Sequence, residues 1–202
     1  MNYRLQVITH SGQDTLPDTL ASFEEMVTPV PDSTEILNDD GDLGFCQNTR
    51  RSWQSAASSK ADFVFWLEHD FRFIRPLDLR PLAAVLEENP RLAQMALIRN
   101  AVNEQEKAAG GWLQYHSSDV DEPYVFSFEK RSYLWYEHGI CLTTNPSLLR
   151  REFMVSNPWP DYSAQCEGRF SENLRQRGYR FAHWSSEEHV KHTGKLRTGH
   201  GY

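Results

Sequence analysis

No uninterrupted apolar run of the chain is longer than five residues, and one of that length, Phe63–Leu67, is followed directly by Glu68-His69-Asp70. A membrane-spanning helix needs about 20 apolar residues, so this run is too short to cross a bilayer. A continuous apolar run without alternation is typical of a strand buried on both faces, as in a parallel sheet covered by helices. The run therefore predicts a β-strand at the centre of an α/β sheet.

Segments with strand and helix periodicity alternate along the rest of the chain. Strands are predicted at residues 5–9, 34–37, 62–67, 95–98, 124–128 and 179–182, and helices at residues 17–26, 44–60, 81–88, 145–151 and 165–177. Short connections between alternating strands and helices are typical of βαβ units and a parallel sheet. Residues 103–135 interrupt this rhythm, and the strand at 124–128 is predicted to be antiparallel. We therefore expect an α/β fold with a mostly parallel central sheet, flanking helices and a small antiparallel addition.

No linker, internal repeat or low-complexity tract divides the 202 residues, so we expect a single domain over 1–202. Residues 187–202 contain three glycines and no apolar periodicity, which predicts a flexible loop. The chain carries 21 Lys and Arg against 28 Asp and Glu, a formal net charge of −7. Indiscriminate nucleic-acid binding depends on dense contacts between basic side chains and phosphates, so it is not expected here.

The three cysteines, Cys46, Cys141 and Cys166, are odd in number and widely spaced. This pattern predicts neither a disulfide framework nor a C-x-x-C metal site, which fits a reducing cytoplasm. The first residues lead directly into a predicted strand and lack the apolar stretch of a signal peptide. We therefore expect a cytoplasmic protein without a membrane span.

Acidic residues follow two of the predicted strands. The segment Asn38-Asp39-Asp40-Gly41-Asp42 lies after one of them, where open α/β sheets bind ligands, and its carboxylates could accept from a base or a ribose hydroxyl. The alternative is an Asp/Gly turn that serves only the local backbone geometry. Glu68 and Asp70 follow the apolar strand and point to the same side, so together they could hold Mg²⁺ or Mn²⁺. The alternative for this pair is a solvated strand end.

Two further segments contain candidate functional residues. In the C-terminal segment, His189 or His192 could complete a metal site, while Lys195 and Arg197 neutralise a diphosphate. The alternative is a disordered basic C-terminus. Glu167 lies at the start of a predicted helix and could act as a general base, although helix N-termini favour acids for dipole reasons alone.

The order of these motifs resembles the GT-A glycosyltransferases, especially the family 2-like group. Residues 34–42 resemble its strand and Asp-Asp-Gly-Ser motif, residues 44–60 its Gly-x₃-Ala-x-Asn helix with Asn48 in the Asn position, and residues 68–70 its Asp-x-Asp metal motif. Residues 150–152 match its Arg-Arg-Glu segment, residues 166–179 its Glu-Asp to Gly-Tyr segment, and residues 192–194 its late His-x-Gly loop. Two departures are Glu68 in place of the first Asp of the metal motif and Gly168 in place of the acid after Glu167.

The resemblance implies a small, Rossmann-like GT-A domain with a nucleotide-sugar-binding half (1–100), an acceptor half (101–186) and a C-terminal loop. It implies a metal-dependent enzyme that moves a hexose or pentose from a nucleoside diphosphate sugar to an acceptor hydroxyl, with inversion. The acceptor stays open among a sugar, a lipid carrier, a protein and a modified nucleic acid base. The alternatives are a sugar-phosphate nucleotidyltransferase, a non-catalytic nucleotide-sugar-binding module and a purely structural interaction protein.

The resemblance also implies a role for each candidate residue. The base and ribose would be contacted by Asp39 and Asp40, in a nucleotide cleft lined by Thr9, His10 and Asn48. The Mn²⁺ or Mg²⁺ ion would be bound by Asp70 with His192 or His189, while Glu68 would orient the ribose or a metal-bound water. The diphosphate would be contacted by Lys195 and Arg197, and Glu167 would deprotonate the acceptor. Trp112, Trp135 and Trp159 are candidates to stack on a sugar or a base.

Overall fold

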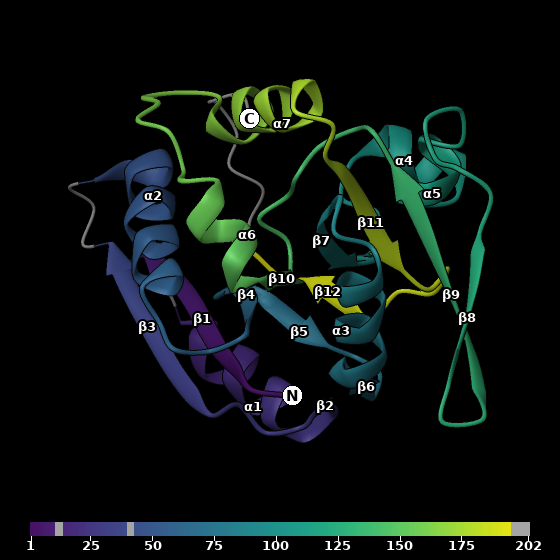
Figure 1. Ribbon diagram of the computed structural model, residues 1–202, viewed down its shortest axis with the longest axis horizontal. Coiled ribbons are helices and arrows are strands. Elements are labelled where there is room, and N and C mark those ends of the chain that lie inside the picture. Colours follow the sequence, from purple (N-terminus) through teal and green to yellow (C-terminus); the bar gives the residue numbers. More distant parts are fainter. Residues whose placement is uncertain (11–13, 40–42, 195–202) are drawn as a thin grey trace.

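The computed structural model describes residues 1–10, 14–39 and 43–194, and its centre is a β-sheet with the strand order β3-β1-β4-β10-β7-β11-β9-β8 (Figure 1). These eight strands are β1 (Tyr3–His10), β3 (Ser33–Asp39), β4 (Phe63–Glu68), β7 (Leu92–Leu97), β8 (Tyr124–Phe128), β9 (Arg131–His138), β10 (Ser147–Arg150) and β11 (Arg180–Trp184). Only β10 and β9 run antiparallel to their neighbours, so the other six strands point the same way. The mostly parallel sheet with a small antiparallel addition is confirmed.

Helices cover both faces of this sheet. Helices α1 (Leu16–Met26) and α3 (Leu79–Glu88) pack on one face, while α2 (Gly44–Ala57), α6 (Arg151–Ser156) and α7 (Cys166–Gln176) pack on the other. Two short helices, α4 (Glu104–Ala109) and α5 (Trp112–Tyr115), lie beside β9 and β11 (Figure 1). Two small sheets pair β2 (Val27–Thr28) with β6 (Leu77–Asp78) and β5 (Phe71–Phe73) with β12 (Val190–His192).

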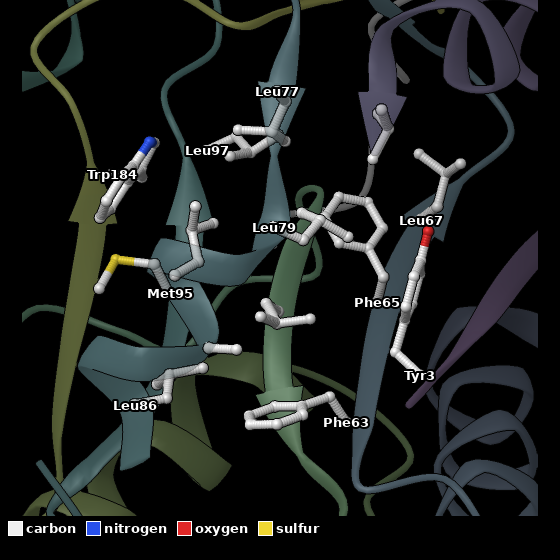
Figure 2. Packing of buried hydrophobic residues seen from close by; sticks show 14 of the residues in the cluster. Tyr3, Phe63, Phe65, Leu67, Leu77, Leu79, Leu86, Met95, Leu97 and Trp184 are labelled. Atoms are coloured by element: carbon white, nitrogen blue, oxygen red, sulfur yellow. The ribbon is translucent and has the colours of Figure 1, made fainter. Parts of the chain in front are cut away.

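Strand β4 is buried on both faces, as its sequence predicts. Phe63, Phe65 and Leu67 belong to the core on the α1 and α3 face, and Val64 and Trp66 to the core on the α2 face. Figure 2 shows side chains of β1, β4, β7 and β11 pointing together toward residues of β6 and α3. A polar substitution within β4 would therefore face an apolar core whichever way it pointed.

The second core is centred on Trp53 of α2. Its ring contacts those of Trp66, Phe153 and Phe170, and its indole N–H donates to the backbone oxygen of Asn157 at 3.0 Å. Trp112, Trp135 and Trp159 are buried as well, with 8, 5 and 2% of their surface exposed. The expectation that one of these three stacks on a sugar or a base is wrong, because packing within the protein covers their rings.

Three predictions of secondary structure are corrected. Residues 147–150, predicted as part of a helix, form strand β10 between β4 and β7, and the helix α6 begins only at Arg151. Residues 190–192, predicted as part of a loop, form β12, which pairs with β5 and buries Val190 completely. Residues 104–115 and 131–138 contain two helices and a strand that were not predicted. No helix among the described residues is long and apolar enough to span a membrane.

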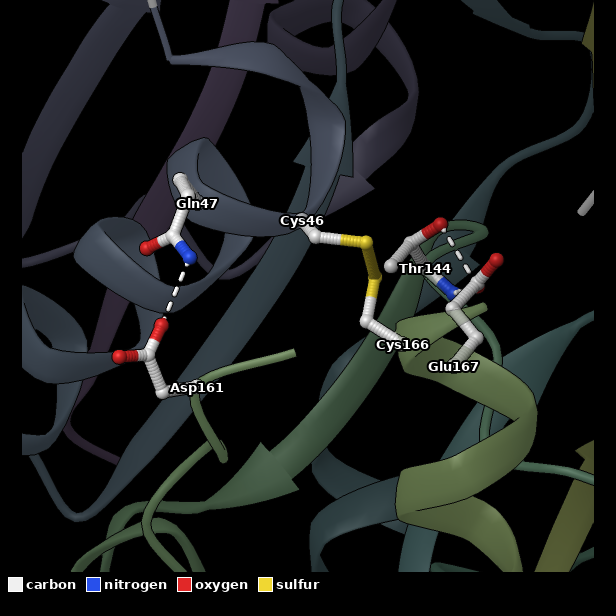
Figure 3. Close-up of a disulfide and its surroundings, with 6 residues drawn as sticks. All are labelled: Cys46, Gln47, Thr144, Asp161, Cys166 and Glu167. Carbon is white, nitrogen blue, oxygen red and sulfur yellow. Dashed lines mark hydrogen bonds between the residues drawn. A yellow bond between two sulfur atoms is a disulfide. The ribbon is translucent and has the colours of Figure 1, made fainter. Parts of the chain in front are cut away.

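The expectation of no disulfide is also wrong. Cys46 of α2 and Cys166 of α7 form one across 120 residues of sequence, while Cys141 is free (Figure 3). Sequence spacing gave no sign of this pair, because the two cysteines meet only when both helices pack on the same sheet face. The cysteine pattern therefore no longer supports the prediction of a reducing cytoplasm.

The disulfide leads to a simple prediction. Alkylation of the unfolded, unreduced protein should modify one cysteine, Cys141, whereas alkylation after reduction should modify all three. Cys46→Ser should lower the free energy of unfolding by about 2–4 kcal/mol, because the unfolded chain gains freedom. Cys141→Ser is the matched control and should keep the cross-link. Three reactive thiols before reduction would show that the pair does not form.

Candidate active site

The parallel strands β1, β3 and β4 bring several predicted site residues to one sheet edge. His10 of β1 lies opposite Asp39 of β3, and Ile8 of β1 lies opposite Glu68 of β4. The carboxyl ends of the three strands therefore meet, as they do at the ligand-binding edge of open α/β sheets. Thr9 lies at the same edge and is 5% exposed.

Asp39 and Asn48 connect this edge to helix α2. The Asp39 carboxylate is buried and accepts from the backbone N–H of Leu43 at 3.1 Å, just before α2 begins. Asn48 is fully buried, and its amide donates to the backbone oxygen of Thr9 at 3.4 Å. The Asn48 Oδ1 atom has no hydrogen-bond partner among the described residues. Asp39 thus supports the turn before α2, and Asn48 presents a buried acceptor beside Thr9.

Asp70 is joined to the C-terminal segment. Strand β12 runs antiparallel to β5, which places His192 opposite Phe71. The His192 Nε2 atom lies 3.1 Å from Asp70 Oδ2. The Thr193 N–H and hydroxyl both donate to the backbone oxygen of Asp70, at 2.7 and 2.9 Å. The His192 N–H donates to Oδ1 of Asn100 at 2.7 Å, so β12 is held from both sides.

The Asp70 carboxylate is partly buried but favours its ionised form. Burial opposes ionisation, yet the hydrogen bond from His192 and the charges of His192 and His69 lower the pKa of Asp70 below its usual range. Its second oxygen, Oδ1, is buried without a hydrogen-bond partner among the described residues. A Cβ on Gly194 would collide with Asp70 Oδ2, so this close approach of the chain requires glycine.

Asp70 and His192 fit a divalent cation that takes most of its ligands from molecules other than the protein. Carboxylate oxygen and imidazole nitrogen are donors that Mn²⁺ accepts, and the buried, unpaired Asp70 Oδ1 is suited to a cation. The described residues contain no group of three or more His, Cys, Asp and Glu side chains placed to hold a metal by themselves. Waters and phosphate oxygens would have to complete such a site, as is usual for Mg²⁺.

His189 has other partners. Its Nδ1 bonds to the backbone oxygen of Glu187 at 3.0 Å, and its backbone N–H donates to Ile98. Burial lowers the pKa of the His189 imidazole. His189 lines a pocket with Trp184 and Tyr133, whereas His192 is the histidine that contacts Asp70.

Glu167 lies in the first turn of α7, directly after the disulfide cysteine Cys166 (Figure 3). One carboxylate oxygen accepts from the Thr144 N–H at 2.8 Å and from its hydroxyl at 2.9 Å. Burial raises the pKa of Glu167, and the two hydrogen bonds from Thr144 offset only part of that effect. A raised pKa suits a general base better than a purely structural helix-terminal acid.

The position of Thr144 places Glu167 near the same sheet edge. Thr144 lies three residues before Ser147, and Ser147 pairs with Trp66 near the carboxyl end of β4 and with Ala96 near that of β7. Sequence patterns did not identify Thr144 or Asn100, since each acts through contacts that exist only in the folded chain. Asp40, Lys195 and Arg197 lie outside the described residues, as does the side chain of His10.

Comparisons with known proteins place the fold. No protein-family model matches the sequence, and no curated protein matches it either. The structure is similar to that of GalNAc-T7 with UDP, GalNAc and Mn²⁺, with a TM-score of 0.58 and 12% identity over 100% of this chain and 45% of that one. It is also similar to S. aureus TarS, with a TM-score of 0.58 and 12% identity over 96% of this chain and 37% of that one. Both are GT-A type glycosyltransferases, so the chain has the GT-A fold, and it spans less than half the length of either protein.

The close approach of Gly194 to Asp70 can be tested by substitution. Gly194→Ala should push β12 away from Asp70, so the amide protons of His192 and Thr193 should lose protection from hydrogen exchange. Gly168→Ala is the matched control, because nothing lies within 4 Å of its added Cβ. That change replaces a glycine in α7 and should stabilise the protein by roughly 0.5–1 kcal/mol. Unchanged protection in Gly194→Ala would contradict the geometry.

Proposed function

We propose that this chain is a metal-dependent glycosyltransferase that moves a sugar from a nucleoside diphosphate sugar to an acceptor hydroxyl. The observation that carries the proposal is the contact between Asp70 and His192, two residues 122 positions apart that meet at the carboxyl edge of a GT-A sheet. The lowered pKa of Asp70 and its buried Oδ1 atom, which has no hydrogen-bond partner among the described residues, support a cation site here. The GalNAc-T7 structure, with UDP and Mn²⁺, supports this choice of ligands.

Asp70 and His192 would hold the Mn²⁺ or Mg²⁺ ion. Glu68, the last residue of β4, would orient the ribose or a metal-bound water. A divalent ion at this place neutralises charge on the leaving diphosphate. Lys195 and Arg197, beyond the described residues, are proposed to add positive charge there. His189 is the less favoured ligand, because it lines a pocket with Trp184 and Tyr133, whereas His192 contacts Asp70.

The nucleoside would lie over the ends of β1 and β3. Asn48 Oδ1 is an acceptor for a base N–H, and Asp39 and Asp40 are proposed to contact the base and ribose. Thr9 and His10 would line the cleft. Because Asp39 is already bonded to Leu43, its position is fixed before a nucleotide binds.

Glu167 would take the proton of the acceptor hydroxyl as that oxygen attacks the anomeric carbon, which gives inversion. Its burial and its bonds to Thr144 hold the carboxylate in place, and its raised pKa gives it the basicity for this step. The disulfide at Cys166 fixes the first turn of α7 against α2, the helix that also contains Asn48.

Calorimetry tests the cation site. UDP and GDP are titrated into the protein with and without Mn²⁺, and at least one of them should bind in a Mn²⁺-dependent manner. Asp70→Asn keeps the shape of the side chain and should abolish the Mn²⁺ dependence. Asp119→Asn, an exposed acid, is the matched control and should retain it. Equal Mn²⁺-dependent binding by the wild type and Asp70→Asn would overturn the site assignment.

The general base is tested by donor hydrolysis, in which water takes the place of the acceptor. Glu167→Gln should slow release of the nucleoside diphosphate by roughly 10²–10⁴-fold and leave donor affinity unchanged. A non-catalytic binding module would instead show no release in the wild type.

Thr144→Val removes one hydrogen bond to the ionised Glu167, which should raise its pKa further. Because the base works only when ionised, the acidic limb of kcat/KM should move to higher pH. Thr143→Val, whose hydroxyl accepts from Asn145 instead, should leave the pH profile in place. Identical profiles for the two variants would argue against Glu167 as the base.

A further inference from the structure

A second concave site lies at the same sheet edge, beyond the end of β11. It is a pocket of about 330 Å³ between β6, the first half of β9 and the connection from β11 to β12. Trp184 ends β11, which runs parallel to β7, so the pocket opens at the carboxyl edge that also holds the candidate active site. None of the roles proposed above uses this pocket, although His189 lines it.

One wall of the pocket is aromatic. The rings of Tyr133 and Trp184 lie 5.2 Å apart at 33°, with Trp184 buried and Tyr133 half-buried. Leu77 and Leu134 extend the apolar surface. An aromatic face of this kind offers a large apolar surface that can pack against the apolar face of a ligand ring.

The rest of the wall is polar and lacks basic residues. It presents the hydroxyls of Ser132, Ser185 and Ser186, and no Lys or Arg is among the described residues that line it. The lining carboxylates of Asp78 and Glu187 are paired with Arg80 and Arg75 outside the lining. An anion such as a diphosphate would therefore find no Lys or Arg to pair with among these lining residues. A neutral polyhydroxyl ligand would find hydrogen-bond donors and acceptors.

His189 adds a neutral acceptor. Its Nδ1–H donates to the Glu187 backbone oxygen when the imidazole is neutral, which leaves Nε2 as the acceptor. The nearby groups are Glu187 and Arg75, whose effects on the imidazole oppose each other, and burial lowers the pKa of His189. A hydroxyl group of a ligand is the natural donor to such a nitrogen.

The loop after β11, which forms one side of the pocket, contains a residue in an uncommon backbone conformation. Ser185 has a φ of 64°, a left-handed value that costs a non-glycine residue free energy. Its N–H donates to Leu134 at 2.8 Å, and its hydroxyl accepts from the Glu187 N–H at 3.1 Å. Such strained residues cluster at functional sites, and these bonds fix the backbone of this loop.

Size and position restrict the ligand. A volume of 330 Å³ is at the lower end of the roughly 300–1,000 Å³ found for small-molecule sites, so one ring-sized unit fits. His189 precedes His192 by three residues, and β12 between them is extended, which separates their backbones by about 10 Å. A ligand unit in the pocket is therefore within reach of a second, linked unit at Asp70.

We propose that this pocket binds one neutral sugar unit of the acceptor, so that the acceptor is a saccharide chain rather than an isolated hydroxyl compound. This inference rests on the proposed glycosyltransferase function. The distal unit would lie on Tyr133 and bond to His189 and the serine hydroxyls, while a linked unit extends toward Glu167 and the donor. The pocket would thereby select a polyhydroxyl acceptor by shape and hydrogen bonding.

The test uses saturation-transfer NMR with a panel of neutral disaccharides: lactose, maltose, cellobiose and chitobiose. At least one should bind. Ser132→Trp fills the pocket from an exposed position and should weaken that binding at least tenfold, and Tyr133→Ala should weaken it as well. Ser118→Trp, an exposed serine that bonds to Asp119, is the matched control and should bind like the wild type. Thermal unfolding confirms that each variant is folded.

Two outcomes would overturn the inference: no disaccharide binds the wild type, or binding survives Ser132→Trp. Asp70→Asn separates this inference from the proposed function, because it should lose Mn²⁺-dependent nucleotide binding and keep the disaccharide. If Mn²⁺-dependent nucleotide binding occurs in the wild type while the disaccharides fail, the pocket assignment is wrong and the proposed function stands. If the disaccharide binds in the pocket but no nucleotide binds, the proposed function fails, and with it the acceptor role.

Discussion

The burial of β4 on both faces is the constraint on which the rest of the structure depends. Phe65 faces one core and Trp66 the other, so the strand can lie only inside a sheet that helices cover on both sides. Its parallel pairing with β1 fixes where it ends. Glu68 is the last residue of β4 and Asp70 follows two residues later, so both lie at the edge where β1 and β3 also end. The position of the acids is a consequence of how the apolar residues before them are buried.

The C-terminal segment depends on this edge in turn. Pairing of β12 with β5 brings His192 to Asp70, and the bond from the His192 N–H to Asn100 holds β12 in place. The resulting hydrogen bond and charge outweigh the burial of Asp70 and keep its pKa low. A small number of backbone contacts thus turns a strand end into a site suited to a cation. The disulfide has a similar effect on the candidate base, because it fixes α7 and with it Glu167.

Periodicity predicted the central strands and the major helices correctly, because those residues are buried in a regular pattern. It failed at Ser147–Arg150, where four residues are too few to separate a strand from a helix, and pairing with β4 and β7 decides the outcome. Motif order grouped Asp70 with His192 or His189, and the folded chain brings His192 into contact with Asp70, while their metal-binding role stays a prediction. It could not identify Thr144 or the Cys46–Cys166 pair, because those contacts belong to no sequence motif and exist only in the folded chain.

The central claim is that a divalent cation binds at Asp70 and His192 together with a nucleoside diphosphate. Paramagnetic broadening by Mn²⁺ measures this most directly: amide signals are recorded while Mn²⁺ is added at low ratio to the protein with UDP or GDP. We expect the signals of residues 70 and 192–193 to broaden first, followed by those near Thr9 and Asn48 at the same sheet edge. Broadening centred elsewhere, for example on the exposed acids Asp119 and Asp121, would contradict the account.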